Sequence, residues 1–221
     1  MKTNLKEMWQ EHRMLLVLTS AIILLQMLVG VLLWDRLPDP MATHFNFQGE
    51  PDGFTSKPFA VFGMPLLLLG LHYMCLLLSC ASNIQMQNIS SKVKSLMLLI
   101  IPAASLLVTV LCYGYALGAP FAIDRIVWVF VGVVFALVGN YLPKMRRSTI
   151  AGIRLPWTLA DEEIWNRTHR FAAPVWVVCG LLMIVCGLIG SGPMLPIAAI
   201  VVVIGLPTAY AMVINWRKYR A

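Results

Sequence analysis

The sequence predicts an all-α polytopic membrane protein with six transmembrane helices and both termini in the cytoplasm. Of its 221 residues, 59% are hydrophobic and only 12% are charged, and the mean hydropathy is +0.78. Soluble domains carry about 45–50% apolar and about 25% charged residues, so this chain has too little polar surface to coat a water-soluble body. A cytosolic enzyme, a disordered chain and a small secreted domain are therefore excluded.

Six runs without Asp, Glu, Lys or Arg are the predicted spans. A helix needs roughly 20 apolar residues to cross the hydrocarbon core, and such runs must be helical because lipid offers no partners to exposed backbone groups. We interpret the first run as a retained anchor, since it is too long for the core of a signal peptide. The six runs are Met14–Trp34, Pro58–Ala81, Leu96–Gly118, Ile126–Leu142, Ala172–Gly190 and Met194–Trp216.

The distribution of Lys and Arg predicts the orientation of the chain. With six spans both termini share one side of the membrane, and 14 of the 17 Lys and Arg residues fall on that side. The other three are Arg36, Lys57 and Arg125. Cytoplasmic loops carry the excess of Lys and Arg, so we expect cytoplasmic termini. This topology explains the net charge of +7, and direct nucleic acid binding is not required.

The cysteines argue against a metal or disulfide framework. All five lie within predicted spans, where Cys mostly behaves as a small hydrophobe, so we expect free thiols, no metal site and no cofactor. They are Cys75, Cys80, Cys112, Cys179 and Cys186.

Polar and small residues mark particular faces of the spans. Gly132, Ala136 and Gly139 recur at helical spacing on the fourth span, and Gly180 and Gly187 on the fifth, which is typical of close helix contacts. On the second span His72, Cys75 and Ser79 share a face, and on the third Ser105, Thr109 and Cys112 do so, so the two polar stripes can meet.

His72 is the ionisable residue deep in a span, and it has two interpretations. One is a proton relay or a substrate contact. The other, which we favour, is a neutral imidazole hydrogen-bonded to Ser or Thr of a neighbouring helix. The first interpretation makes a small transporter or channel, with a polar site around His72, Ser105 and Thr109, the alternative function.

The outer loop, residues 35–57, is predicted to be compact. Two Pro-rich stretches and a Pro-Asp-Gly turn indicate a folded segment. His44, Glu50 and Asp52 permit a weak metal site, but a packed polar cap is the favoured interpretation.

The inner loop, residues 143–171, has a basic first half and a predicted short amphipathic helix in its second half. Thr158 is the expected cap of this helix, with Asp161 three residues on, and the helix is expected to lie along the cytoplasmic interface. The basic half has two equally weighted interpretations. One is attraction to anionic lipid, worth about 1 kcal/mol per cation; the other is a structured site, in which Arg154 grips a carboxylate or phosphate beside Pro156 and Trp157.

These loop residues resemble two known sequence families. The inner stretch, with Gly139-Asn140-Tyr141, Gly152-Ile153-Arg154 and Pro156-Trp157-Thr158-Leu159, resembles the signature of the SdpI family. The outer loop, with Leu37-Pro38, Gly49, Asp52-Gly53 and Ser56-Lys57, resembles the DUF1648 segment that often precedes it. The resemblance divides the chain into a DUF1648-like half, residues 1–118, and an SdpI-like half, residues 119–221.

The resemblance implies a function in a bacterial cytoplasmic membrane. The founding family member is an immunity protein that protects a toxin-producing bacterium from its own secreted peptide and holds a repressor at the membrane. A non-enzymatic role in toxin resistance or signalling is therefore expected, with the bilayer, a peptide toxin outside and a repressor-like protein inside as partners. The implied inner site comprises Asn140, Lys144, Arg146, Gly152, Arg154, Pro156, Trp157, Thr158, Trp165, His169 and Arg170, and the implied outer residues are His44, Phe45, Gly49, Asp52 and Lys57.

A membrane enzyme is the least favoured class. The sequence has no HExxH motif, no Gly-x-Ser-x-Gly motif and no paired aspartates within the spans.

Overall fold

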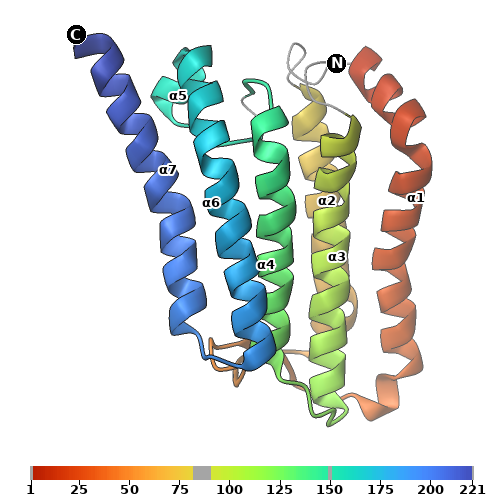
Figure 1. Cartoon of the computed structure of the whole chain (residues 1–221). Helices are drawn as coiled ribbons and strands as arrows, with labels where there is room; N and C mark the ends of the chain where they lie inside the picture. The colour runs from red at the N-terminus through yellow and green to blue at the C-terminus, as the bar shows by residue number, and fades with distance from the viewer. Residues whose placement is uncertain (1, 82–90, 149–150, 221) are drawn as a thin grey trace. The chain divides into compact units, whose positions relative to one another are not determined.

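The computed structural model describes residues 2–81, 91–148 and 151–220 (Figure 1). The described chain divides into two compact units, here called the N-terminal unit, which ends at Ile123, and the C-terminal unit, which begins at Asp124. Each unit contains three long helices that run in alternating directions.

The N-terminal unit combines its three helices with a small sheet between the first two. Its elements are α1 (Lys2–Leu32), η1 (Trp34–Arg36), β1 (Met41–Phe45), β2 (Pro51–Thr55), η2 (Phe59–Gly63), α2 (Met64–Ala81) and α3 (Ser91–Ala116). Helix α1 buries one stripe at alternating spacings of four and three residues, which keeps a single helix face towards its neighbours. That stripe is His12, Leu16, Thr19, Ile23, Gln26 and Gly30.

The described part of the C-terminal unit is built from helices joined by irregular loops, without a strand. Its elements are α4 (Ile123–Tyr141), η4 (Leu142–Lys144), α5 (Pro156–Ala160), α6 (Glu162–Ile189) and α7 (Met194–Arg220). Helices α4 and α6 approach closely at their glycines: a Cβ added to Gly132 would lie 2.5 Å from the Gly180 carbonyl oxygen, and one added to Gly180 would lie 2.7 Å from the Ala136 nitrogen. The predicted small-residue stripes of these two helices therefore face each other.

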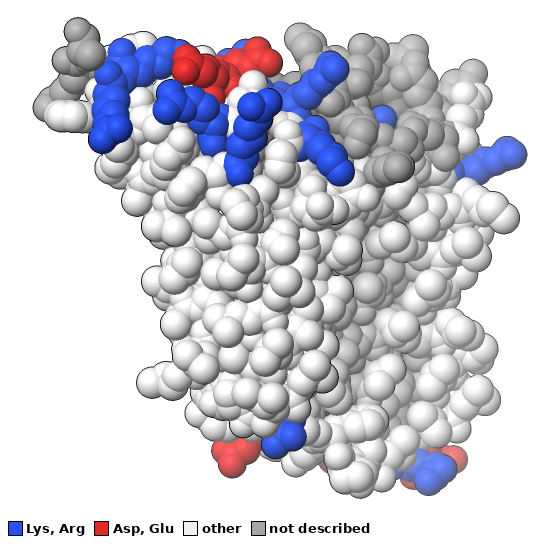
Figure 2. All heavy atoms as spheres, in the orientation of Figure 1, with Lys and Arg blue, Asp and Glu red and all other residues white. Residues whose placement is uncertain are grey.

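Six helices of the described chain are long and apolar enough to cross a membrane, so the prediction of six spans is confirmed. They are His12–Leu32, Phe59–Leu77, Val93–Ala116, Ile123–Lys144, Glu162–Ile189 and Met194–Tyr219. The charge distribution fits this assignment. On the face seen in Figure 2 the helix walls carry no charge, and the Lys, Arg, Asp and Glu side chains lie at the helix ends. The chain is a multi-pass membrane protein.

The prediction of a separate interfacial helix before the fifth span is wrong. The residues expected to form it are the first turns of α6, which continues without interruption to Ile189. The cap is Asp161 and not Thr158, because the Asp161 carboxylate accepts hydrogen bonds from the N–H groups of Glu163 and Ile164. Thr158 instead lies inside the five-residue helix α5.

The all-α prediction also fails in the outer loop, which contains a β-hairpin. Strands β1 and β2 pair antiparallel, with Met41 opposite Thr55 and Phe45 opposite Pro51. The turn forms because the Asn46 side-chain oxygen accepts from the N–H groups of Gln48 and Glu50 at 3.0 and 2.9 Å. Gly49 takes a φ of 81°, in the left-handed region that glycine enters at little cost.

Candidate functional site

The inner loop is organised around a buried tryptophan and a buried histidine. The rings of Trp165 and His169, one turn apart on α6, stack with their centroids 4.0 Å apart, and both residues are almost fully buried. The Trp165 indole N–H donates to the Met145 carbonyl oxygen at 2.8 Å. This bond ties α6 to the chain that leaves α4.

His169 holds the middle of the loop through both of its ring nitrogens. Nδ1 lies 2.8 Å from the Trp165 carbonyl oxygen, so it carries the proton, and Nε2 accepts from the Ile153 N–H at 2.9 Å. The imidazole is therefore neutral with its Nδ1 tautomer selected. Gly152 makes this approach possible, because its φ is 117° and a Cβ there would lie 2.5 Å from His169 Nε2.

Thr158 fixes the same segment from its other side. Its buried hydroxyl donates to the Ile153 carbonyl oxygen at 2.7 Å and accepts from the Leu155 N–H at 2.8 Å. The end of α5 is closed by Arg147, whose guanidinium donates to the carbonyl oxygens of Leu159 and Ala160 at 3.2 and 3.1 Å. Residues 153–155 are thus bonded to the fold through Ile153 and Leu155, on both sides of Arg154.

The corner between α5 and α6 is clamped by the end of α7. Lys218 Nζ lies 2.8 Å from Asp161 Oδ2 and 2.6 Å from Glu163 Oε2, and the Tyr219 hydroxyl donates to Asp161 Oδ2 at 2.8 Å. The hydrogen bonds from Lys218, Tyr219 and the backbone N–H groups hold the pKa of the Asp161 carboxyl well below its usual range. Sequence reasoning missed this clamp, although an Asp directly before a helix was a readable cap signal.

The predicted inner-site residues fall into two sets. Gly152, Thr158, Trp165 and His169 come together inside the loop, and Trp157 is half-buried, with an indole N–H that has no partner among the described residues. The others lie on the surface. Lys144 Nζ is 5.2 Å from the Tyr141 ring centroid. Cations gather near the described ends of α4, α6 and α7 (Figure 2). These exposed residues are Asn140, Lys144, Arg146, Arg154, Pro156 and Arg170.

In the outer loop, Lys57 binds back onto the chain that precedes the hairpin. Its Nζ donates to the carbonyl oxygens of Trp34 and Leu37 at 3.2 and 2.9 Å and lies 5.1 Å from the Trp34 ring centroid. Its backbone N–H donates to the Asp39 carboxylate at 3.0 Å. One cation therefore closes the loop around its own backbone.

The other predicted outer residues do not form a metal site. His44 Nδ1 pairs with Asp52 Oδ1 at 2.5 Å, whereas Glu50 accepts from the Asn46 amide at 3.3 Å. Among the described residues no group of three potential metal ligands comes together. Phe45 points inward and meets Tyr115 edge-on, with centroids 5.4 Å apart.

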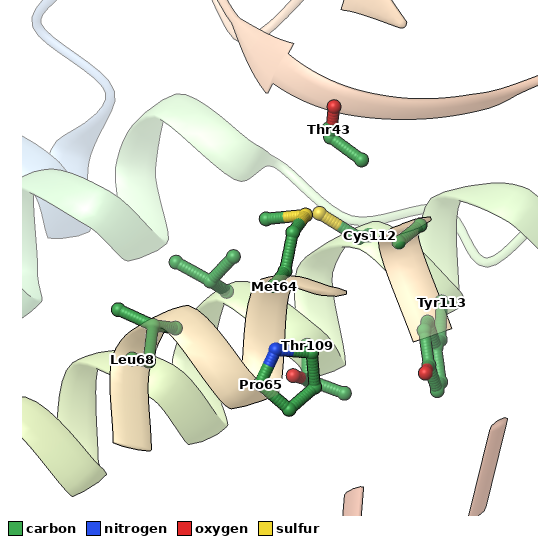
Figure 3. A pocket seen from close by; sticks show the side chains of 9 residues that line it. Thr43, Met64, Pro65, Leu68, Thr109, Cys112 and Tyr113 are labelled. Carbon is green, nitrogen blue, oxygen red and sulfur yellow. The ribbon is translucent and has the colours of Figure 1, made fainter. Parts of the chain in front are cut away.

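A narrow pocket lies beneath the hairpin in the N-terminal unit (Figure 3). It leaves only about 10 Å³ for a water-sized molecule. Thr43 of β1 stands at one end, Thr109 and Tyr113 of α3 at the other, and Met64 and Cys112 between them. Its walls are mostly apolar, and no charged residue lines it.

His72 of α2 and both Ser105 and Thr109 of α3 bond to polar side chains of α1. His72 Nε2 lies 3.2 Å from the Thr19 hydroxyl, whereas Ser105 and Thr109 each donate to Gln26 Oε1 at 2.8 Å. Sequence reasoning missed Thr19 and Gln26, and the available signal was two polar residues spaced two helical turns apart in an otherwise apolar run. The polar site proposed for a transporter is therefore two separate hydrogen-bonded groups. Ser79 lies outside the residues whose side chains are described.

Comparisons with known proteins find two matching regions in the chain. Residues 144–211 match the SdpI/YfhL protein family, and residues 21–69 match a domain of unknown function, DUF1648. The "Immunity protein SdpI" of Bacillus subtilis (strain 168) is 28% identical over 172 residues, which cover 76% of this chain and 79% of that protein. No solved structure matches the chain. The resemblance drawn from the loops is confirmed: residues 144–211 form an SdpI/YfhL family region, a DUF1648 segment precedes it, and the chain is a distant relative of the immunity protein.

Proposed function

We propose that this protein protects a bacterial cell against a membrane-active peptide and signals through a soluble cytoplasmic protein that binds its inner loop. The excess of Lys and Arg at one set of helix ends supports cytoplasmic termini. The relative in Bacillus subtilis is an immunity protein, which supports this class of function.

The rigid presentation of Arg154 is the observation that carries the inner-site role. Its neighbours Ile153 and Leu155 are bonded to His169 and Thr158, so the backbone that bears its side chain is held on both sides. A guanidinium on a fixed backbone loses little freedom when it grips a carboxylate by two parallel bonds. An acidic segment of a soluble protein is the partner that fits this surface.

Attraction to anionic lipid is the simpler role for these cations. It would add about 1 kcal/mol per residue near the surface, but it needs only charge. The stacked Trp165 and His169 and the glycine at residue 152 serve no purpose in a lipid-attracted run, because such a run works without a defined backbone. The ordered loop therefore favours a shaped partner.

Survival of a sensitive bacterium tests the proposal. Cells that express wild type, Arg154→Ala or Arg217→Ala at equal membrane levels are challenged with a panel of secreted antimicrobial peptides while the membrane potential is recorded. Arg217 is the matched control, because it is an exposed arginine beyond the family region. We expect wild type and Arg217→Ala to survive and keep the potential, and Arg154→Ala to lose this protection.

Two results would contradict the proposal. If cells that express Arg154→Ala survived as well as cells that express wild type, the role of the inner site would be removed. If the wild type protected against none of the peptides in the panel, the immunity role would be removed and only the membrane location would remain.

A further inference from the structure

Two phenylalanines are exposed on the outer hairpin, outside the segments that are long and apolar enough to span the membrane. Phe47 is 61% exposed and Phe54 is 57% exposed. They lie between the spans that end at Leu32 and begin at Phe59, so they are not part of the apolar helix walls. An exposed apolar patch rimmed by polar residues is typical of an interaction site.

Two acidic residues, Glu50 and Asp52, belong to the same hairpin as these aromatic rings. Asp52 and Phe54 are alternate residues of β2 and both are exposed, so they share one face of the hairpin. Glu50 and Phe47 lie in or beside the turn that Asn46 organises. The hairpin, residues 41–55, contains no Lys or Arg, so its charge is opposite in sign to the net charge of +7 of the whole chain.

We propose that this face, made of Phe47, Glu50, Asp52 and Phe54, binds a cationic amphipathic peptide. The phenylalanines take up its apolar side and the carboxylates meet its lysines or arginines, which raises the rate of encounter and selects the sign of charge. An anionic lipid surface is a poorer fit, because Glu50 and Asp52 are repelled by it. The inference rests on the proposed function and orientation, and it adds the charge of the toxin and the residues that meet it.

Binding to protein in lipid nanodiscs tests this inference without any measurement of cell survival. The probes are a fluorescent Leu/Lys amphipathic peptide and its Leu/Glu counterpart, titrated with phosphatidylcholine nanodiscs that hold the protein or are empty. We expect the Leu/Lys peptide to bind protein-loaded nanodiscs at least about tenfold more tightly than empty ones, a difference of about 1.4 kcal/mol. The Leu/Glu peptide is expected to show no such preference.

Paired variants separate the apolar from the charged contribution. Phe47→Ser with Phe54→Ser is expected to abolish the preference, and Glu50→Gln with Asp52→Asn to reduce it and to remove its dependence on salt. These side chains are exposed, and the amides retain the hydrogen bonds to Asn46 and His44. Leu117→Ser and Asp35→Asn are the matched controls, since both residues are exposed but lie outside the hairpin.

Three results would overturn the inference. They are equal binding to loaded and empty nanodiscs, unchanged binding by the hairpin variants, and burial of the hairpin in lipid. The last is detected when a Phe54→Cys thiol in phosphatidylglycerol nanodiscs is protected from a water-soluble maleimide before any peptide is added. A wild type that protects cells yet fails here would leave the proposed function standing and remove only this site.

Discussion

The backbone N–H of Ile153 donates to Nε2 of His169 at 2.9 Å, across 16 residues of sequence. This bond needs a neutral imidazole, because an imidazolium has no lone pair to accept with. It connects a residue inside α6 to the segment that presents Arg154. Changes at His169 are therefore expected to act on the loop before they act on any partner.

His169→Phe is expected to keep the stacked ring against Trp165 and to leave the Ile153 N–H without its acceptor. An unsatisfied buried donor costs about 1–3 kcal/mol. Equilibrium unfolding in detergent measures the cost, and hydrogen exchange at the Ile153 amide localises it. His44→Phe, at an exposed histidine, is the control; equal exchange at Ile153 in wild type and His169→Phe would contradict the assignment.

Gly152→Ala is expected to destabilise the loop more than Gly192→Ala. Both glycines have positive φ, 117° and 77°, but only the Cβ at residue 152 would meet the Trp165 and His169 rings. Both variants share the backbone strain, so the difference between them reports the overpacking at residue 152. Overpacking lowers the free energy of unfolding by about 1–3 kcal/mol. Thermal unfolding of the two variants measures it, and equal midpoints would show that the rings move aside freely.

The clamp of Asp161 by Lys218 and Tyr219 is expected to weaken in acid. The pKa of Asp161 is lower in the folded chain than in the unfolded chain, so the folded state binds fewer protons between those two values. The clamp therefore contributes fully above about pH 4, the ordinary range of Asp, and is lost as the pH falls further.

Hydrogen exchange in the last turn of α7 reports this acid dependence. Asp161→Asn retains the helix cap but carries no charge, so its exchange is expected to be faster at neutral pH and nearly independent of acid. Glu162→Gln, at an exposed residue that no clamp contact uses, is expected to behave like wild type. Acid-dependent exchange that persists in Asp161→Asn would refute the role of this carboxylate.

Lys57→Met is expected to loosen the outer loop, because it leaves the Trp34 and Leu37 carbonyl oxygens without their donor. Hydrogen bonds to a charged group are worth about 1.5–3 kcal/mol. Limited proteolysis of the hairpin measures the change, with Arg36→Met, at an exposed cation of the same loop, as the control. Identical cleavage rates would show that the loop is held by its apolar contacts alone.

Thr19→Val tests the pairing of α1 with α2. The substitution preserves volume and removes the hydroxyl that lies 3.2 Å from His72 Nε2. Side-chain hydrogen bonds between membrane helices contribute about 0.6 kcal/mol on average and up to about 1.7 kcal/mol, so a loss in that range is expected on unfolding. Ser20→Ala is the control. It removes the hydroxyl that contacts Tyr73, so it measures the stability lost when an exposed hydroxyl is removed.

Much of this architecture was predictable because the bilayer restricts it. Uncharged runs must be helical in lipid, and six helices follow from six runs. The ends were less predictable: Asp161 competes with Thr158 as the cap, and an amphipathic segment that continues into a span cannot be told from a separate helix by its pattern alone. The hairpin was missed because its strands are short and bulged.

The sequence by itself determined the six spans, the asymmetry of Lys and Arg, and the two loops whose motifs resemble the SdpI and DUF1648 families. The tertiary structure decided which polar groups meet: His72 with Thr19, Ser105 and Thr109 with Gln26, and Ile153 with His169. The physical reason is that a span requires only apolar composition and length, whereas a hydrogen bond between elements depends on the rotation and register of each helix. Those quantities are set by packing at residues such as Gly132 and Gly152, where a single methyl group would displace the neighbouring chain.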